Sequence, residues 1–233
     1  MYVMRTWGDA AGTACGLLAA AALLVGPLGC VTRGKYGDME AERNALTKRV
    51  SELQKEHDSL EELHADLSTQ LESRSAEINK MKGTYDALVK DLEAEVASGH
   101  VQIEQLREGI RVNMAEEILF PSGSAELNEQ GRGVLGKVAA DLKDAAHLIA
   151  VLGHTDDVPI SSRLKSRYPS NWELGGARAT RVVRLFQEKG VDGVRLEAVS
   201  RGPFAPIAAN QTAEGRSKNR RIEIRLMPAT SRQ

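Results

Sequence analysis

The sequence predicts an α+β domain, with helices packed on one mixed sheet, that follows a long coiled-coil helix. Hydrophobic residues make up 42% of the 233 residues but aromatic residues only 4%, so Leu, Val, Ile and Ala must supply most of the burial. A heptad pattern runs through the first half of the chain, and short alternating apolar runs occupy the second half. This length suits one compact domain plus an extended segment better than two large domains.

The amino-terminal segment has the pattern of an export signal. Residues 10–31 carry no charge, and their strongly apolar part, Leu17–Val25, is shorter than the roughly 20 residues of a membrane span. The run ends in Pro-Leu-Gly-Cys, which resembles a bacterial lipobox, where the cysteine is lipidated and becomes the first mature residue. We therefore expect a signal peptide over residues 1–29 and a lipidated membrane tether over residues 30–35, beginning at Cys30. Two alternatives stay open, an uncleaved inner-membrane helix and a plain signal peptide in which Cys30 has no role.

Residues 36–97 have the pattern of a coiled-coil rod. Fourteen positions are spaced alternately by four and three residues, and eleven of the fourteen are apolar. These seam positions are Leu46, Val50, Leu53, His57, Leu60, His64, Leu67, Leu71, Arg74, Ile78, Met81, Tyr85, Leu88 and Leu92. Because a single polar helix has nowhere to bury such a stripe, we expect the protein to form a homo-oligomer through the rod.

Two histidines, His57 and His64, occupy seam positions seven residues apart. Stacked imidazoles could form a metal site or a pH-sensitive device, but polar seam residues more commonly set the register and the number of helices. We favour the register role and expect no metal and no cofactor. After the rod, residues 98–109 are expected to form a helical or irregular connector.

The rest of the chain alternates strand and helix patterns. The expected strands cover residues 110–120, 148–152, 194–200 and 220–226, and the expected helices cover residues 128–144 and 170–189. Ser170, with Glu173 three residues later, forms a capping box at the start of the second helix. The order β-α-β-α-β-β indicates two helices packed on one sheet.

Several motifs of this region resemble the OmpA-like peptidoglycan-binding domain family, which includes the carboxy-terminal domains of MotB and Pal. The motifs are Gly153-His154-Thr155-Asp156, Asn171-Trp172-Glu173-Leu174 with Arg178-Ala179, Gly202 to Pro206, and the run from Asn210 to Glu223. The resemblance covers residues 110–227 and leaves residues 228–233 as a tail. The insertion before Ser170 is closer to MotB-type members, and Gly175 departs from the family, which usually has Ser there.

The resemblance also implies a binding site. In this family a pocket captures the diaminopimelate side chain of the peptidoglycan stem peptide through an acid and an arginine. By position, Asp156 would hold the ammonium group and Arg178 the carboxylate, which a planar guanidinium can grip at two points. Thr155 and Asn171 are the implied hydrogen-bonding supports. The alternative is a structural salt bridge between Asp156 and Arg178. The later polar residues are expected to be scaffolding that adds positive potential, namely Asn210, Arg216, Asn219, Arg220 and Arg221.

These features favour a lipoprotein of the outer membrane, facing the periplasm, that binds peptidoglycan noncovalently and tethers the membrane to the wall. An acidic rod, with fifteen acids and eight bases, and a basic end over residues 160–233, with six acids and fifteen bases, agree with this. The alternative is a MotB-like inner-membrane stator or transport-complex subunit anchored to peptidoglycan. An enzyme is not expected, because no second metal-ligand or acid-base motif accompanies His154, Asp156 and Asp157. Nucleic acid is not an expected partner, because the basic residues are interspersed rather than gathered on one helix.

Overall fold

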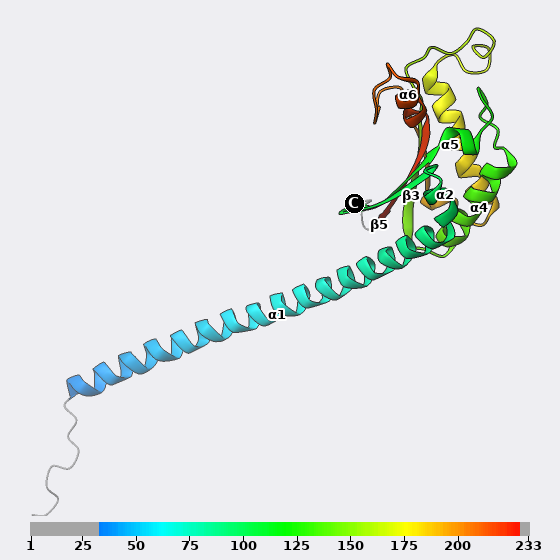
Figure 1. Ribbon diagram of the computed structural model, residues 1–233. Helices are drawn as coiled ribbons and strands as arrows, with labels where there is room; N and C mark the ends of the chain where they lie inside the picture. Colours follow the sequence, from blue (N-terminus) through cyan, green and yellow to red (C-terminus); the bar gives the residue numbers. More distant parts are fainter. Residues whose placement is uncertain (1–32, 229–233) are drawn as a thin grey trace, which may run out of the picture. The chain divides into compact units, whose positions relative to one another are not determined.

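The computed structural model describes residues 33–228 (Figure 1). The signal segment and Cys30 lie outside the described residues, so their assignments stay predictions. The chain forms two compact units, which divide between Asp66 and Leu67. Among the described helices, none is both long enough and apolar enough to cross a membrane.

Six α-helices and five strands make up the described chain. The helices are α1 (Arg33–Asp91), α2 (Glu93–Ala97), α3 (Glu116–Leu119), α4 (Glu129–Lys143), α5 (Asn171–Glu188) and α6 (Ala213–Asn219). The strands are β1 (Val101–Leu106), β2 (Gly109–Ala115), β3 (His147–His154), β4 (Leu196–Gly202) and β5 (Arg221–Pro228), and a short 3-10 turn, η1 (Gly193–Arg195), precedes β4. The predicted α+β class is therefore confirmed, with one mixed five-stranded sheet.

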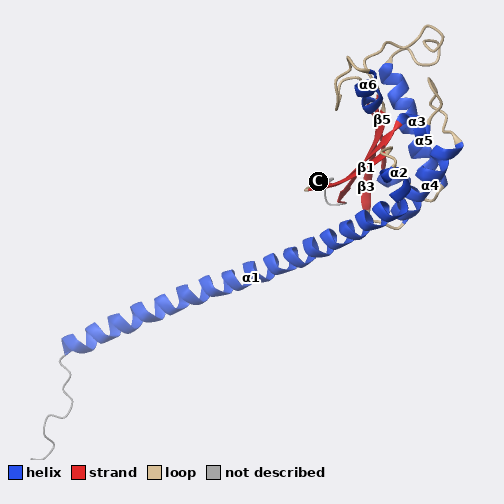
Figure 2. Cartoon of the chain, in the orientation of Figure 1, coloured by secondary structure: helices blue, strands red, loops and turns tan. Residues whose placement is uncertain are grey.

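The sheet has the strand order β1-β2-β5-β3-β4. Every neighbouring pair is antiparallel except β3 and β4, which are parallel and therefore need a crossover connection, supplied by α5. The helices α4 and α5 cover one face of the sheet (Figure 2). On β5 the alternation places Ile222, Ile224 and Leu226 in the core between sheet and helices. The intervening charged residues of β5 consequently lie on the opposite face.

Both covering helices begin at side-chain caps. Asn128 Oδ1 accepts a hydrogen bond from the backbone N–H of Gly131 at 2.6 Å, at the start of α4. Ser170 and Glu173 form the predicted capping box at the start of α5, with Glu173 Oε2 accepting from the Ser170 N–H at 2.7 Å. Such caps satisfy N–H groups that the first helical turn leaves unpaired, and each is typically worth about 1 kcal/mol.

The helix α5 approaches β3 closely at two glycines. A Cβ atom at Gly153 would overlap the backbone carbonyl of Gly175. A Cβ atom at Gly175 would lie 2.7 Å from Ser200 Oγ and 3.0 Å from Gly153 O. The departure from Ser at position 175 therefore has a packing reason, because only a hydrogen atom fits between this helix and the sheet without a shift.

The carboxy-terminal turns of the predicted rod belong to the core of the domain. Met81, Leu88 and Leu92 are buried in the same apolar cluster as the sheet and helix residues, and burial of each leucine contributes roughly 1.5–3 kcal/mol. Thr84 Oγ1 lies 3.0 Å from Nε2 of the buried His147 on β3, which fixes this part of α1 further. The assignment of these positions to the seam of a coiled-coil rod is therefore wrong for residues 81–92, which pack against their own domain. The seam positions from Leu46 to Ile78 are largely exposed.

Two local predictions are wrong, and one element was not predicted. Residues 98–109 are not a helical or irregular connector, because β1 pairs with β2 in a hairpin whose turn is closed by Gly109 at φ 141°. The strand predicted over residues 110–120 ends at Ala115, where α3 begins. The third difference is the helix α6, on which Arg216 and Asn219 lie and which the sequence analysis did not predict. Each is a short element whose length gives little periodic signal.

Candidate functional site

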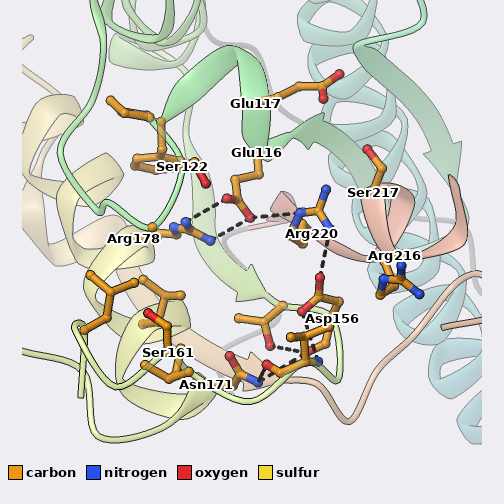
Figure 3. Close-up of a pocket in the computed structure, with 18 of the residues that line it drawn as sticks. Glu116, Glu117, Ser122, Asp156, Ser161, Asn171, Arg178, Arg216, Ser217 and Arg220 are labelled. Carbon is orange, nitrogen blue, oxygen red and sulfur yellow. Dashed lines mark hydrogen bonds and ion pairs between the residues drawn. The ribbon is translucent and has the colours of Figure 1, made fainter. Parts of the chain in front are cut away.

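A cleft of about 780 Å³ opens where the carboxyl end of β3 meets α3, α5 and α6 (Figure 3). Its wall combines apolar side chains with six charged ones. Three carboxylates and three guanidinium groups line it, from Glu116, Glu117, Asp156, Arg178, Arg216 and Arg220. A cleft with equal numbers of both charges suits a ligand that itself carries both charges.

Arg178 is buried on α5, with 3% of its surface exposed. Its Nε donates to Ser124 O at 2.9 Å, its Nη2 donates to Glu116 Oε1 at 2.7 Å, and its Nη1 lies 2.7 Å from Glu116 Oε2. The guanidinium carbon lies 5.3 Å from the centre of the Phe120 ring, a cation–π distance. These contacts hold the side chain in one orientation in the wall of the cleft.

Asp156 follows β3 and is also mostly buried. Its Oδ1 accepts from the Val158 N–H at 3.2 Å, and its Oδ2 accepts from Arg220 Nη1 at 2.8 Å. Arg220 Nε in turn lies 3.7 Å from Glu116 Oε2. Among the described contacts none joins Asp156 to Arg178 directly, so the alternative of a salt bridge between these two residues is wrong.

The four charged side chains instead form a chain of alternating sign, Arg178, Glu116, Arg220 and Asp156 (Figure 3). The two arginines differ in accessibility, because the side chain of Arg220 is 36% exposed and that of Arg178 is 3% exposed. Arg220 is therefore the cation that solvent and a ligand reach first. Arg220 was expected to be scaffolding, and the structure places it in the cleft wall with ion pairs to both carboxylates; Glu116 was not singled out by the sequence at all.

Thr155 and Asn171 support the turn that carries Asp156. Thr155 Oγ1 donates to Asp156 O at 2.9 Å, and Asn171 Nδ2 donates to Asp156 O at 3.3 Å and to Val158 O at 3.0 Å. Both side chains line the cleft, but their described hydrogen bonds go to the backbone of this turn. Their role in the described structure is to position the carboxylate.

The helix α6 and the preceding loop position Arg216 and Arg220. Thr212 Oγ1 accepts from the Gly215 N–H at 3.0 Å and caps α6. Asn219 is fully buried, and its Oδ1 accepts from the N–H groups of Ile207 and Ala208 at 2.8 and 3.0 Å. Asn219 is therefore scaffolding, as expected, and it ties the loop to the end of the helix from which Arg220 projects.

Comparison with known proteins shows to which family this chain belongs. Residues 119–220 match the model of the OmpA family. The chain is 31% identical over 180 residues to the uncharacterized protein YtxE of Bacillus subtilis, covering 75% of this chain and 73% of that protein. The chain belongs to the OmpA family. The resemblance expected from the sequence is thereby confirmed, and the domain is an OmpA-family peptidoglycan-binding domain.

Two further relatives match this chain over only part of their own length, and one solved structure matches over most of its length. Motility protein B of Bacillus subtilis is 30% identical over 154 residues, 65% of this chain and 57% of that protein. The probable lipoprotein YiaD of Escherichia coli is 35% identical over 129 residues, 55% of this chain and 56% of that protein. A solved structure of the cell wall anchor of the T6SS from Pseudomonas aeruginosa superposes with a TM-score of 0.56 at 33% identity, covering 60% of this chain and 96% of that one. The chain thus spans a little over half of the length of two of these relatives.

His154 does not line the cleft and pairs with residues elsewhere in the domain. On the face of the sheet opposite the apolar core, the buried His154 has its Nε2 3.0 Å from Glu223 Oε2, and Arg225 Nε donates to Glu223 Oε1 at 2.5 Å. Burial alone would raise the pKa of Glu223, but the contacts with His154 and Arg225 outweigh it and lower the pKa from 4.5 to about 2. Burial lowers the pKa of His154. His154 is thus paired with a structural carboxylate and not with Asp156, in agreement with a family of non-enzymatic binding proteins.

One group of side chains on the described helix α1 has metal-ligand geometry. The ligand atoms of His57, Asp58 and Glu61 lie within 4.8 Å of one another, and all three residues are exposed. They are neighbours on one helical turn, where such proximity follows from the helix itself. Nothing in the described residues around them adds a buried or convergent ligand, so the register role stays the prediction for His57.

Proposed function

We propose that the cleft recognises the zwitterionic end of diaminopimelate in the peptidoglycan stem peptide. The observation that carries this proposal is the alternating chain of Arg178, Glu116, Arg220 and Asp156 along one wall. Diaminopimelate ends in an ammonium group beside a carboxylate. Asp156 takes the ammonium group, while Arg178 and the more exposed Arg220 take the carboxylate.

Glu116 has a supporting part in this proposal. It pairs with Arg178 and lies near Arg220, so it sets the orientation of both guanidinium groups before a ligand arrives. Thr155 and Asn171 do the same for Asp156 through its backbone. A site prepared in this way loses little conformational entropy on binding, which favours affinity.

A pair of matched peptides tests the proposal. A stem peptide with diaminopimelate and one with lysine differ by the single carboxylate next to the terminal ammonium group. One charged hydrogen-bonding contact is worth about 1.5–3 kcal/mol, so the diaminopimelate peptide should bind roughly tenfold to 150-fold more tightly. Arg220→Ala should reduce this preference, and Asp156→Ala should weaken both peptides. Equal affinity of the unchanged protein for the two peptides would exclude the assignment.

We propose further that the protein is an outer-membrane lipoprotein, anchored at Cys30 and facing the periplasm, that tethers this membrane to the wall. Support comes from the lipobox-like Pro-Leu-Gly-Cys sequence and from similarity to a relative named a probable lipoprotein. The exposed apolar seam from Leu46 to Ile78 supports homo-oligomerisation through a second copy of α1. Mass spectrometry of the mature amino terminus tests the anchor, because a diacylglyceryl-modified Cys30 is required.

The second candidate is a stator-like or transport-complex subunit of the inner membrane. Similarity to motility protein B over 154 residues favours it. Against it, Asp9 is outside the apolar run Leu17–Val25, whereas proton-driven subunits of this type place an acid within the membrane helix. An intact Met1 in the mature protein, together with recovery in the inner-membrane fraction, would favour this candidate over the lipoprotein.

A further inference from the structure

Two exposed aromatic side chains stack on each other next to the cleft. Trp172 is 46% exposed and Phe204 is 73% exposed, and their ring centroids are 5.5 Å apart with an interplanar angle of 29°. The other aromatic residues between positions 101 and 228, Phe120, Tyr168 and Phe186, are buried. In a domain with so few aromatic residues, this solvent-exposed pair forms a distinct apolar surface.

The backbone beneath the two rings holds them in place. Gly202 has φ 50°, and a Cβ atom there would lie 3.4 Å from Trp172 Cδ2 and 3.7 Å from Phe204 Cδ2. Ser200 Oγ donates to Trp172 O at 2.8 Å. The carbonyl of Gly202 accepts from the Thr155 N–H at 3.0 Å. The rings therefore rest on the end of β4, which is hydrogen-bonded to the turn that carries the cleft carboxylate.

The aromatic pair is adjacent to the cleft along two paths. Trp172 directly follows Asn171, whose Nδ2 donates to Asp156 O at 3.3 Å, and consecutive Cα atoms are about 3.8 Å apart. Gly202, under both rings, is bonded to Thr155, the residue before Asp156. Trp172 and Phe204 do not line the cleft themselves, but both are joined through neighbouring backbone to the turn that carries Asp156.

We propose that Trp172 and Phe204 form a platform for a sugar ring of the peptidoglycan glycan strand while the stem peptide occupies the cleft, an inference that rests on the proposed function. The C–H groups on the face of a pyranose are apolar and slightly positive, and the face of an aromatic ring is negative, so the two pack together. Because sugar and stem peptide are covalently joined, the second contact acts within one ligand and adds to affinity through effective concentration.

The size of the platform favours a sugar over a protein partner. Aromatic side chains bury about 150–250 Å² each, whereas a standard protein interface needs about 800 Å² from each partner. Two rings match the area of one or two sugar units. The charge distribution agrees, because the rings themselves carry no charge and a neutral N-acetylated sugar brings none.

The test compares two ligands on residues 33–233, which contain the whole described core from Met81 onward. The ligands are the disaccharide tetrapeptide with diaminopimelate and the free tetrapeptide. We expect Trp172→Ala and Phe204→Ala each to weaken the disaccharide tetrapeptide about tenfold and the free tetrapeptide less than about twofold, as loss of one stacking contact implies. Val194→Ala, at an equally exposed apolar position on η1, is the matched control and should change neither affinity.

Fluorescence gives a second readout, because Trp172 is the sole tryptophan of residues 33–233. Peptide-free glycan strands should shift its emission. An absent shift, or equal weakening of both ligands in Phe204→Ala, would overturn the platform while leaving the peptide site intact. Failure of the unchanged protein to bind either ligand would overturn the proposed function instead. A fall in oligomer size in Phe204→Ala by sedimentation would also overturn the inference, since the rings would then join copies of this chain.

Discussion

Replacing Glu116 by Ala should destabilise the domain strongly, because it leaves Arg178 buried without its counter-ion. The side chain of Glu116 is 12% exposed and that of Arg178 is 3% exposed, and two pairs of their atoms lie 2.7 Å apart. At about 4 Å and an effective dielectric constant of about 20, such a pair attracts by roughly 4 kcal/mol. Breaking a buried pair from one side typically costs about 3–5 kcal/mol.

In Glu116→Ala, Arg178 keeps two of its stabilising contacts, but the neighbouring Arg220 increases the loss of stability. The hydrogen bond to Ser124 O and the Phe120 ring still stabilise the guanidinium group. Arg220, however, loses the carboxylate that lies 3.7 Å from its Nε and then faces Arg178 with like charge. We therefore expect a loss of about 3 kcal/mol in the free energy of unfolding, which corresponds to about 6–12 °C in Tm for a chain of this size.

Urea and thermal unfolding of residues 33–233 measure this loss, and the neighbouring acid supplies the control. The side chain of Glu117 is 62% exposed, and its Oε1 lies 3.6 Å from His100 Nε2. Glu117→Ala should change stability by less than about 1 kcal/mol, as surface ion pairs do. If Glu116→Ala were no more destabilising than Glu117→Ala, the argument that Glu116 organises the charged wall would be refuted.

Four further predictions concern the rest of the described chain. Because the pKa of Glu223 is lowered from 4.5 to about 2, the stability that its charge contributes is complete above pH 4.5 and is lost as the pH falls toward 2. Glu223→Gln should therefore lower the free energy of unfolding by about 3 kcal/mol at neutral pH and by much less near pH 2. A loss that does not depend on pH would contradict this. Gly153→Ala should abolish cooperative thermal unfolding, since its Cβ atom would overlap backbone, and a native-like Tm would refute the close approach. Thr84→Val should lower the free energy of unfolding by about 1–3 kcal/mol, because it leaves the buried His147 nitrogen unpaired. Thr47→Val, on an exposed turn of α1, is the control and should lower it by less than about 1 kcal/mol, with both measured by urea unfolding. Leu60→Lys should reduce the oligomer size in sedimentation without lowering the stability of the domain, and an unchanged size would exclude the seam as the contact.

The rod shows what a periodic pattern can and cannot predict. The spacing of apolar residues from Leu46 to Leu92 predicted one long helix with one apolar stripe, and α1 carries that stripe to Asp91. The same spacing is compatible with two different fates, however. Met81 and Leu88 are covered by the core of their own domain, whereas Leu60 and Leu71 are exposed. Periodicity states that a face is apolar, but the partner that covers it depends on tertiary contacts that leave no local signal.

The charged wall shows the same limit for polar residues. Asp156 and Arg178 were found because they stand in recognisable motifs. Glu116 stands 62 residues before Arg178, at a position that the sequence assigned to the end of a strand, and Arg220 stands 64 residues after Asp156. Ion pairs between such distant positions have no characteristic spacing. Only the antiparallel pairing of β2 with β5, which puts Ala115 opposite Arg221, brings Glu116 and Arg220 to the same end of the sheet.

The alternating order of these four charges has a consequence for what the cleft selects. Glu116 and Asp156 each neighbour at least one guanidinium group, so a simple anion that displaced Asp156 from Arg220 would leave one buried carboxylate without a partner. A simple cation would leave a guanidinium group in the same position. A ligand with an ammonium group and a carboxylate on one carbon replaces both partners at once, because it supplies a cation to Asp156 and an anion to Arg220. If the proposed function holds, we expect this arrangement to discriminate by the cost of unpaired charges as much as by attraction, and so to favour a zwitterion over the single charges of the cell envelope.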